Sequence, residues 1–171
     1  IYCKKFKSVG VCENFYYPTT FDEASLQLDY FLKEKFENFG SFQDAITKDI
    51  KQNFLFHSNI SSSLNIGLLD LNELIEKIVA FDAPYNTKEG FIRQIIGWRE
   101  FMLRVYEDDG ILLRNSNFFE FKNSMPQKII EAKSGIKILD DTILKLNLTA
   151  YNHHIERLMI LGNIFLLLEI K

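Results

Sequence analysis

Two adjacent imidazoles are the clearest candidates for chemistry in this 171-residue chain. His153 and His154 stand at the start of an apolar segment with helical spacing, and adjacent residues on a helix point about 100° apart, which argues against a shared metal ion. An imidazole titrates near neutral pH and can carry a proton in a reaction. We predict that His154, which would share a helical face with Leu158 and Gly162, carries the proton. His153, four residues before Arg157, would position it. The alternative is that both histidines have only a structural role.

A second candidate surface lies on a predicted long helix. Gly90, Gln94 and Gly97 recur on one face of this helix, although a glycine in a helix interior costs about 1 kcal/mol relative to alanine. The glycines indicate that something large, such as a flat aromatic ligand, packs close to the backbone; close packing of another helix is the alternative. Trp98, the only Trp, and Arg99 would lie beside such a ligand, or form an aromatic anchor and a solvated charge.

A serine-rich segment could hold phosphate oxygens. Ser58, Ser61, Ser62 and Ser63 precede or open a predicted helix, where free backbone N–H groups favour anions. Serine-rich loops also occur simply as capping loops, so the segment gains weight only together with other features.

The composition predicts a helix-rich globular chain. Apolar residues make up 47% and charged residues 25% of the sequence, with eight Gly and three Pro. A chain of this length can bury most of its apolar surface in one domain. The formal net charge of −3 gives no general attraction for nucleic acid, so any such contact has to be local.

Several protein classes lack support in the sequence. A Walker loop, an HExxH helix and a Ser/His/Asp order are absent, which argues against hydrolases and nucleotide kinases. Cys3 and Cys12 fit neither a disulfide framework nor a zinc site, and predict reduced thiols in a cytoplasmic protein. The longest apolar run, residues 158–168, contains Gly162 and Asn163 and is shorter than the ~20 residues that span a bilayer, so we expect no membrane association.

The apolar spacing predicts an all-α fold of short helices with irregular connections. Capping boxes at Thr20 and Asp70 mark two helix starts, and Gly40 and Pro84 are expected to end those helices. We find no alternating strand pattern or hairpin turn. The predicted helices cover residues 20–40, 41–50, 70–81, 87–107, 127–132, 140–147 and 151 onward, with a break at 108–110. Residues 1–19 are predicted to be a linker or the end of a preceding segment.

Four blocks resemble the bacterial photolyase-related proteins, the prokaryotic (6-4) photolyases and cryptochromes that generally carry an iron–sulfur cluster. They occur in the family's order and are residues 39–46, 57–69, 89–101 and 153–163. The resemblance implies that residues 20–171 are the N-terminal part of the helical FAD-binding domain, without the antenna domain and without the C-terminal part. Because the chain starts at Ile1 and stops shortly after an apolar run, we expect a fragment of a longer protein. The intact protein is expected to be a monomer.

The resemblance also implies an activity and its residues. The activity is light-driven repair of UV-damaged DNA, of the (6-4) type, in which reduced FAD donates an electron to a flipped-out lesion and a histidine transfers a proton. The antenna pigment is left open. The implied sites are His153 and His154 in the catalytic cavity, His57, Ser58 and Ser61 at the flavin phosphates, Gln94, Arg99 and Arg157 near the flavin, and Trp98 at the lesion.

One position departs from the family. Its first cluster-binding cysteine lies thirteen residues before the tyrosine that precedes the histidine pair, and counting back from Tyr151 gives Ile138. An isoleucine cannot ligate iron, and Cys3 and Cys12 lie in the wrong region. We therefore expect FAD but no iron–sulfur cluster.

Two other functions remain open. A cryptochrome-like blue-light receptor would keep FAD and repair nothing, and it would need the same flavin site. A photolyase should show exposed Arg and Lys around the pocket mouth, whereas a receptor need not. A cofactor-free α-helical interaction module is the third alternative, and the glycine and histidine pattern argues against it.

Overall fold

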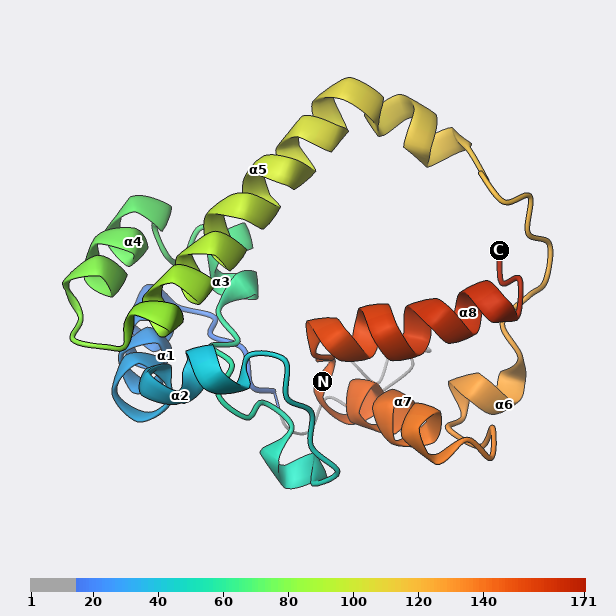
Figure 1. Cartoon of the computed structure of the whole chain (residues 1–171), viewed down its shortest axis with the longest axis horizontal. Helices are drawn as coiled ribbons and strands as arrows, with labels where there is room; N and C mark the ends of the chain where they lie inside the picture. Colours follow the sequence, from blue (N-terminus) through green and yellow to red (C-terminus); the bar gives the residue numbers. More distant parts are fainter. Residues whose placement is uncertain (1–14) are drawn as a thin grey trace. The chain divides into compact units, whose positions relative to one another are not determined.

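The computed structural model describes residues 15–171, which form an all-α fold as predicted (Figure 1). Within this range the only bridge between extended residues joins Asn123 and Ile170. None of the described helices is both long and apolar enough to cross a membrane. Cys3, Cys12 and most of the predicted linker lie outside the described residues. The elements are α1 (Phe21–Glu34), α2 (Phe36–Phe42), a 3₁₀ turn η2 (Ile50–Gln52), α3 (Ser61–Asn65), α4 (Leu71–Ala80), α5 (Tyr85–Asn115), α6 (Gln127–Ile130), α7 (Lys137–Thr149), a π-helix η3 (Glu156–Gly162) and α8 (Asn163–Leu167).

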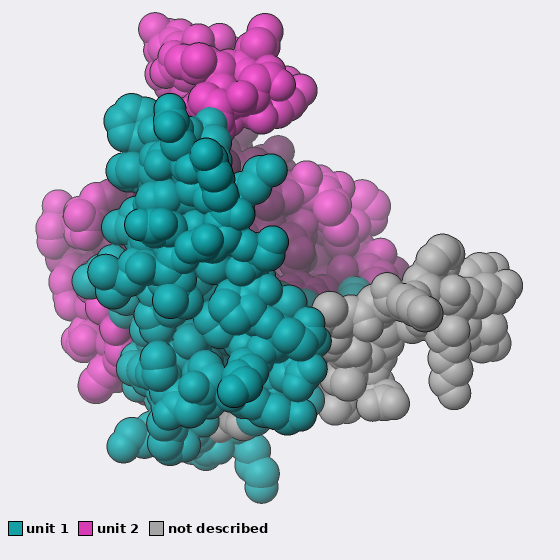
Figure 2. Space-filling model, turned by 90° about the vertical axis from the view of Figure 1, so that its right-hand side faces the viewer, with its two compact units in different colours: residues 1–16, 46–53, 117–171 teal, residues 17–45, 54–116 magenta. Residues whose placement is uncertain are grey.

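The chain divides into two compact units, each made of segments that are separate in sequence (Figure 2). Residues 17–45 and 54–116 form what we call the long-helix unit, which contains α1 to α5. Residues 46–53 and 117–171 belong to the histidine unit, which contains η2, α6, α7, η3 and α8. The predicted flavin and lesion contacts on α5 therefore belong to one unit, and the histidine pair belongs to the other.

An aromatic core anchors the first half of α5 in the long-helix unit. Phe31, Phe36, Phe39 and Phe91 are all buried. The Phe91 ring lies 5.5 Å from that of Phe36 and 5.2 Å from that of Phe39, both edge to face. Such pairs add about 0.5–1.5 kcal/mol each to the gain from burial. This packing fixes the position of α5 at Phe91 and therefore orients the residues that follow it in the helix.

The prediction that Gly40 ends the first helix is wrong. The helix is interrupted at Lys35, whose φ of −127° and ψ of −29° depart from helical values, and α2 then runs through Gly40. A Cβ on Gly40 would lie 2.7 Å from both the backbone N and Oγ1 of Thr87. The Gly40 N–H donates to Thr87 Oγ1 at 3.0 Å, and this hydroxyl donates to the Glu37 carbonyl at 3.2 Å. The glycine is needed because α2 and α5 meet there.

Helix α5 is longer than the sequence predicts. It begins directly after Pro84 and passes through the expected break at residues 108–110. Arg104 Nε lies 2.6 Å from Asp108 Oδ2, an ion pair one turn apart at the start of that stretch. A single glycine costs a helix only about 1 kcal/mol, so Gly110 does not end one whose neighbouring residues favour it.

The other helix predictions are mostly confirmed, with shifted ends. Helix α4 starts after Asp70, whose carboxylate accepts two backbone N–H groups at 2.8 and 3.0 Å. The helix predicted over residues 41–50 is wrong, because α2 ends at Phe42 and η2 begins only at Ile50. Thr47 Oγ1 accepts the Asp49 N–H at 3.1 Å, a local bond that competes with helical hydrogen bonding.

The histidine unit combines a small apolar core with an unusual number of buried polar groups. Its core consists of five aliphatic residues from α6, α7 and η3. Seven of the nine buried polar or charged residues in the described part of the chain lie in this unit. They are Asn53, Thr142, Lys145, Thr149, Asn152, His153 and Glu156.

The last helix begins at His154, later than the predicted Tyr151, and its first full turns are π-helical. A Cβ on Gly162 would lie 3.2 Å from the carbonyl oxygen of Arg157, five residues earlier, which is the spacing that a π turn brings together. The α-helical spacing that was expected to align His154, Leu158 and Gly162 therefore does not apply. A close backbone approach explains the glycine.

Candidate functional site

A hollow of about 330 Å³ opens along α5 in the long-helix unit. It is lined by Arg93, Gln94, Gly97, Trp98 and Phe101. A Cβ on Gly97 would meet nothing within 4 Å, so this part of the helix surface is open. Trp98 is 50% exposed and packs edge to face against Phe101, with ring centroids 5.9 Å apart. The helix thus presents bare backbone and aromatic surface, which suit a flat ring system.

The second glycine of the predicted face has a different role. Gly90 is buried, and a Cβ there would lie 3.1 Å from Oε1 of Gln43. A side chain from the end of α2 thus occupies the space that the absent Cβ leaves. Of the two glycines, Gly97 alone fits the predicted ligand face, and Gly90 serves packing within the unit.

The serine-rich helix α3 is joined to α5 by Arg99. Its Nη1 donates to Asn65 Oδ1 at 3.1 Å, which connects the end of α3 to the stretch of α5 that carries Trp98. Ser61 is exposed at the start of α3. The hydroxyls of Ser62 and Ser63 are buried and have no hydrogen-bond partner within the described residues. A buried polar group left unpaired costs about 1–3 kcal/mol, so these hydroxyls are suited to a partner.

His57 and Ser58 precede α3 and are both half-buried. The His57 ring lies edge to face against Phe39, with centroids 6.0 Å apart, and its backbone N–H donates to the Phe54 carbonyl at 2.8 Å. The structure thus joins the predicted phosphate-binding segment to the aromatic core of the same unit.

In the histidine unit, His153 caps the last helix. Its Nδ1 accepts the Ile155 N–H at 2.9 Å, and its own N–H donates to Glu156 Oε2 at 3.2 Å. This reciprocal arrangement is a capping box in which histidine takes the usual place of serine or threonine. Because Nδ1 is an acceptor, the neutral ring carries its proton on Nε2. His153 is only 4% exposed, so its ring is buried.

His154 follows as the first helical residue and is half-buried. The two imidazoles stack, with centroids 4.4 Å apart and planes inclined by 24°. Arg157 is exposed, and its backbone N–H donates to the His153 carbonyl at 3.0 Å. The pair is thus asymmetric: one ring forms part of the helix cap, and the other rests against it and is more accessible.

A buried ion pair, which the sequence analysis missed, lies under this cap. Lys145 Nζ contacts Glu156 Oε1 at 2.9 Å, and the two side chains are only 4% and 3% exposed. The ammonium also donates to the Thr47 carbonyl. Asn152 Nδ2 donates to Glu156 Oε2 at 3.1 Å. The three-residue spacing from His153 to Glu156 is a sequence signal for the box, but histidine is not a usual cap residue.

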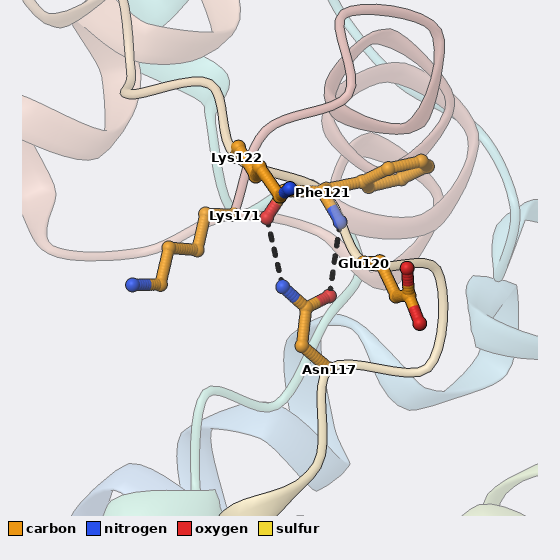
Figure 3. Close-up of a pocket in the computed structure, with 5 residues that line it drawn as sticks. All are labelled: Asn117, Glu120, Phe121, Lys122 and Lys171. Atoms are coloured by element: carbon orange, nitrogen blue, oxygen red, sulfur yellow. Dashed lines mark hydrogen bonds between the residues drawn. The ribbon is translucent and has the colours of Figure 1, made fainter.

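A second hollow, of about 380 Å³, lies in the histidine unit (Figure 3). It is lined by Asn117, Glu120, Phe121, Lys122 and Lys171. The Asn117 amide spans the turn: Nδ2 donates to the Phe121 carbonyl at 2.8 Å, and Oδ1 accepts the Phe121 N–H at 3.2 Å. None of the predicted site residues lines this hollow. The Asn117 side-chain amide is already hydrogen-bonded to the backbone of the turn.

Comparison with known proteins gives two relatives. Over 162 residues the chain is 40% identical to a protein described as "(6-4) photolyase" from Agrobacterium fabrum. The aligned region covers 92% of this chain and 32% of that protein. Over 107 residues it is 32% identical to "Uncharacterized protein R853" of Acanthamoeba polyphaga mimivirus, which covers 58% of this chain and 78% of the viral protein. The chain therefore spans about a third of the length of the bacterial relative. A scan against models of known protein families finds no match.

Proposed function

We propose that this photolyase-related chain, which belongs to one family with the mimivirus protein R853, takes part in the light-driven, FAD-dependent repair of UV-damaged DNA. The relation to a (6-4) photolyase over 92% of the chain carries the proposal, and it favours the (6-4) photoproduct as the lesion. Residues 20–171 would form the N-terminal part of a helical FAD-binding domain. The intact protein, meaning the natural polypeptide that carries these residues, would be the active species.

The α5 hollow supports a flavin contact. Gln94, Gly97 and Trp98 line a surface with open space at the glycine, so a flat ring system can approach the backbone. Gln94 offers both a donor and acceptors to such a ring, and Trp98 offers a face for stacking to the flavin or to a flipped-out base. When bound, reduced FAD supplies the electron for the repair reaction under light.

The α3 region supports contacts to the phosphates of the cofactor. His57, Ser58 and Ser61 would face them, and the unpartnered hydroxyls of Ser62 and Ser63 lie in the same segment. Arg99, held by Asn65 at 3.1 Å, would complete the positive side of this region, with Arg157 as a further cation near the flavin. These residue types are the usual donors to phosphate oxygens.

The asymmetry of the histidine pair supports separate roles for the two rings. His153 is tied to the backbone through Nδ1, so it is suited to positioning. His154, stacked on it and more accessible, would hold or move the proton at its ring nitrogen. In the intact protein, His154→Asn should lower repair of a (6-4) lesion by about 100-fold per flavin-loaded molecule. Full repair by a folded, flavin-loaded variant would refute this role.

We also propose that the intact protein lacks an iron–sulfur cluster. The position of the expected first ligand is Ile138, which is 51% exposed on α7 and cannot bind iron. Anaerobically purified protein should contain flavin and essentially no acid-labile sulfide. About four iron and four sulfide per chain would contradict the proposal.

A blue-light receptor without repair activity is the second candidate, and one observation favours it. The cation that lines the α5 hollow, Arg93, already pairs with Glu89 at 3.2 Å. The exposed pair is weak, however, and a phosphate group can replace the carboxylate. An absorption spectrum of the intact protein tests for flavin, and a light-dependent repair assay on (6-4) and cyclobutane lesions separates the two candidates. Flavin bands without repair of either lesion would leave the receptor.

A further inference from the structure

Glu156 connects a buried ammonium group to the backbone of the histidine pair. Its Oε1 accepts from Lys145 Nζ at 2.9 Å. Its Oε2 accepts from the His153 N–H at 3.2 Å and from Asn152 Nδ2 at 3.1 Å. Both oxygens are therefore in use, and both belong to a side chain that is 3% exposed.

This arrangement is costly to bury. The free-energy cost of removing two charges from water is offset only when their geometry is good and their remaining hydrogen-bond sites are satisfied. Here the ammonium has a second acceptor in the Thr47 carbonyl, and Asn152 is fixed by a further bond to the Thr142 carbonyl at 3.2 Å. Well-packed apolar residues would give comparable stability, so the polar network points to a requirement for a particular geometry.

We propose that Glu156 is a positioning residue for the histidine pair, and that Lys145 keeps its carboxylate in place. The carboxylate accepts the His153 N–H, and the resulting cap directs His153 Nδ1 to the Ile155 N–H. The His153 ring, fixed in this way, packs against the His154 ring with a centroid distance of 4.4 Å. The inference rests on the proposed function, because the pair is taken to serve the repair reaction.

Two double variants isolate the acceptor for the His153 N–H. Both carry Lys145→Met, so neither leaves a lone buried charge. Glu156→Gln retains an oxygen for the His153 N–H, whereas Glu156→Leu fills the space without one. The surface variant Lys137→Met, which breaks the exposed pair of Lys137 with Asp141 at 3.0 Å on the same helix, is the control.

The first measurement is the tautomer of His153, from long-range ¹H–¹⁵N spectra of the ¹⁵N-histidine-labelled chain. The parent, the control and the Gln variant should show one tautomer with the proton on Nε2, because Nδ1 stays an acceptor. The Leu variant should show mixed tautomers and altered His154 ring shifts. A single unchanged tautomer in the folded Leu variant would overturn the inference. If that variant does not fold, Glu156→Met, with a more adaptable side chain, takes its place with the same expected outcomes.

The second measurement is light-dependent repair by the intact, flavin-loaded protein. The Leu variant should lose about 10-fold to 100-fold in kcat with little change in KM, since a displaced proton carrier slows the reaction without weakening lesion binding. Unchanged kcat would overturn the positioning role. If the tautomer responds as expected but His154→Asn repairs fully, the proposed function of the pair fails and the structural link from Glu156 to His153 stands.

Discussion

The ring of His153 is both a helix cap and half of the histidine pair. Its Nδ1 accepts the Ile155 N–H at 2.9 Å, so protonation of that nitrogen would remove the acceptor. This hydrogen bond favours the neutral tautomer that carries its proton on Nε2. The cap residue thus lies directly beside His154, which we propose as the proton carrier.

This dual role predicts different outcomes for two substitutions of His153. His153→Ala removes the cap and should lower the free energy of unfolding by about 1–2 kcal/mol, whereas His153→Asn, a good cap residue, should change it by less than about half of that. Urea unfolding followed by circular dichroism measures both. Equal losses for Ala and Asn would show that the ring contributes through packing and not as a cap.

At the scale of the element, α5 meets α2 through the contact between Gly40 and Thr87. Gly40→Ala would place a Cβ 2.7 Å from the Thr87 backbone N, which cannot move away as a side chain could. Such overpacking costs about 1–3 kcal/mol. We expect a lower urea midpoint with an unchanged m-value. A midpoint equal to that of the parent would mean that the two helices separate freely there.

Gly97→Ala is the contrasting change, on the open face of α5. A Cβ there would meet nothing within 4 Å, and alanine is the better helix former. The free energy of unfolding should therefore increase by about 0.5–1 kcal/mol. If the hollow holds the flavin, the added methyl group should weaken FAD retention in the intact protein. Absorbance after gel filtration measures this. Greater stability with unchanged FAD content would show that the flavin ring does not lie in the α5 hollow.

The sequence predicts those helix starts that depend on nearby residues. The caps at Thr20 and Asp70 are present in the structure because their hydrogen bonds reach only two or three residues along the chain. The sequence underestimates the length of α5, because Gly110 predicts a stop that the structure does not have. Lys145 contacts Thr47 across 98 residues and Glu156 across 11, and such contacts leave no local pattern. The polar network of the candidate site could therefore not be predicted.

At the scale of the whole molecule, carboxylates with lowered pKa values occur in both units. The Thr19 N–H donates to Glu23 at 2.8 Å and lowers its pKa. The Ser134 hydroxyl, at 2.6 Å, and the Ser134 and Gly135 N–H groups lower the pKa of Asp140. Each unit therefore carries at least one carboxylate whose ionised form is favoured by folding.

These shifts predict acid sensitivity. A depressed folded-state pKa stabilises the protein above the unfolded values, about 3.9 for Asp and 4.3 for Glu, and this stabilisation is lost as the pH falls through the lower folded values. The urea midpoint should decrease below about pH 4. Asp140→Asn should lower it at pH 7 and flatten its decline in acid. A parent and variant with parallel pH profiles would show that Asp140 does not contribute.

The π turn between Glu156 and Gly162 has a consequence for how this part of the chain can vary in length. A π turn holds one residue more than the α turn that it replaces, and such turns are rare outside functional regions. Loss of a single codon within it would restore ordinary i to i+4 bonding and leave the residues after Gly162 facing nearly as they do now, whereas loss of a codon from an ordinary α turn rotates everything after it by about 100°. The apolar side chains of α8 would therefore keep nearly their present directions. The π turn is therefore a place where this chain can lose one residue without turning the helix that follows.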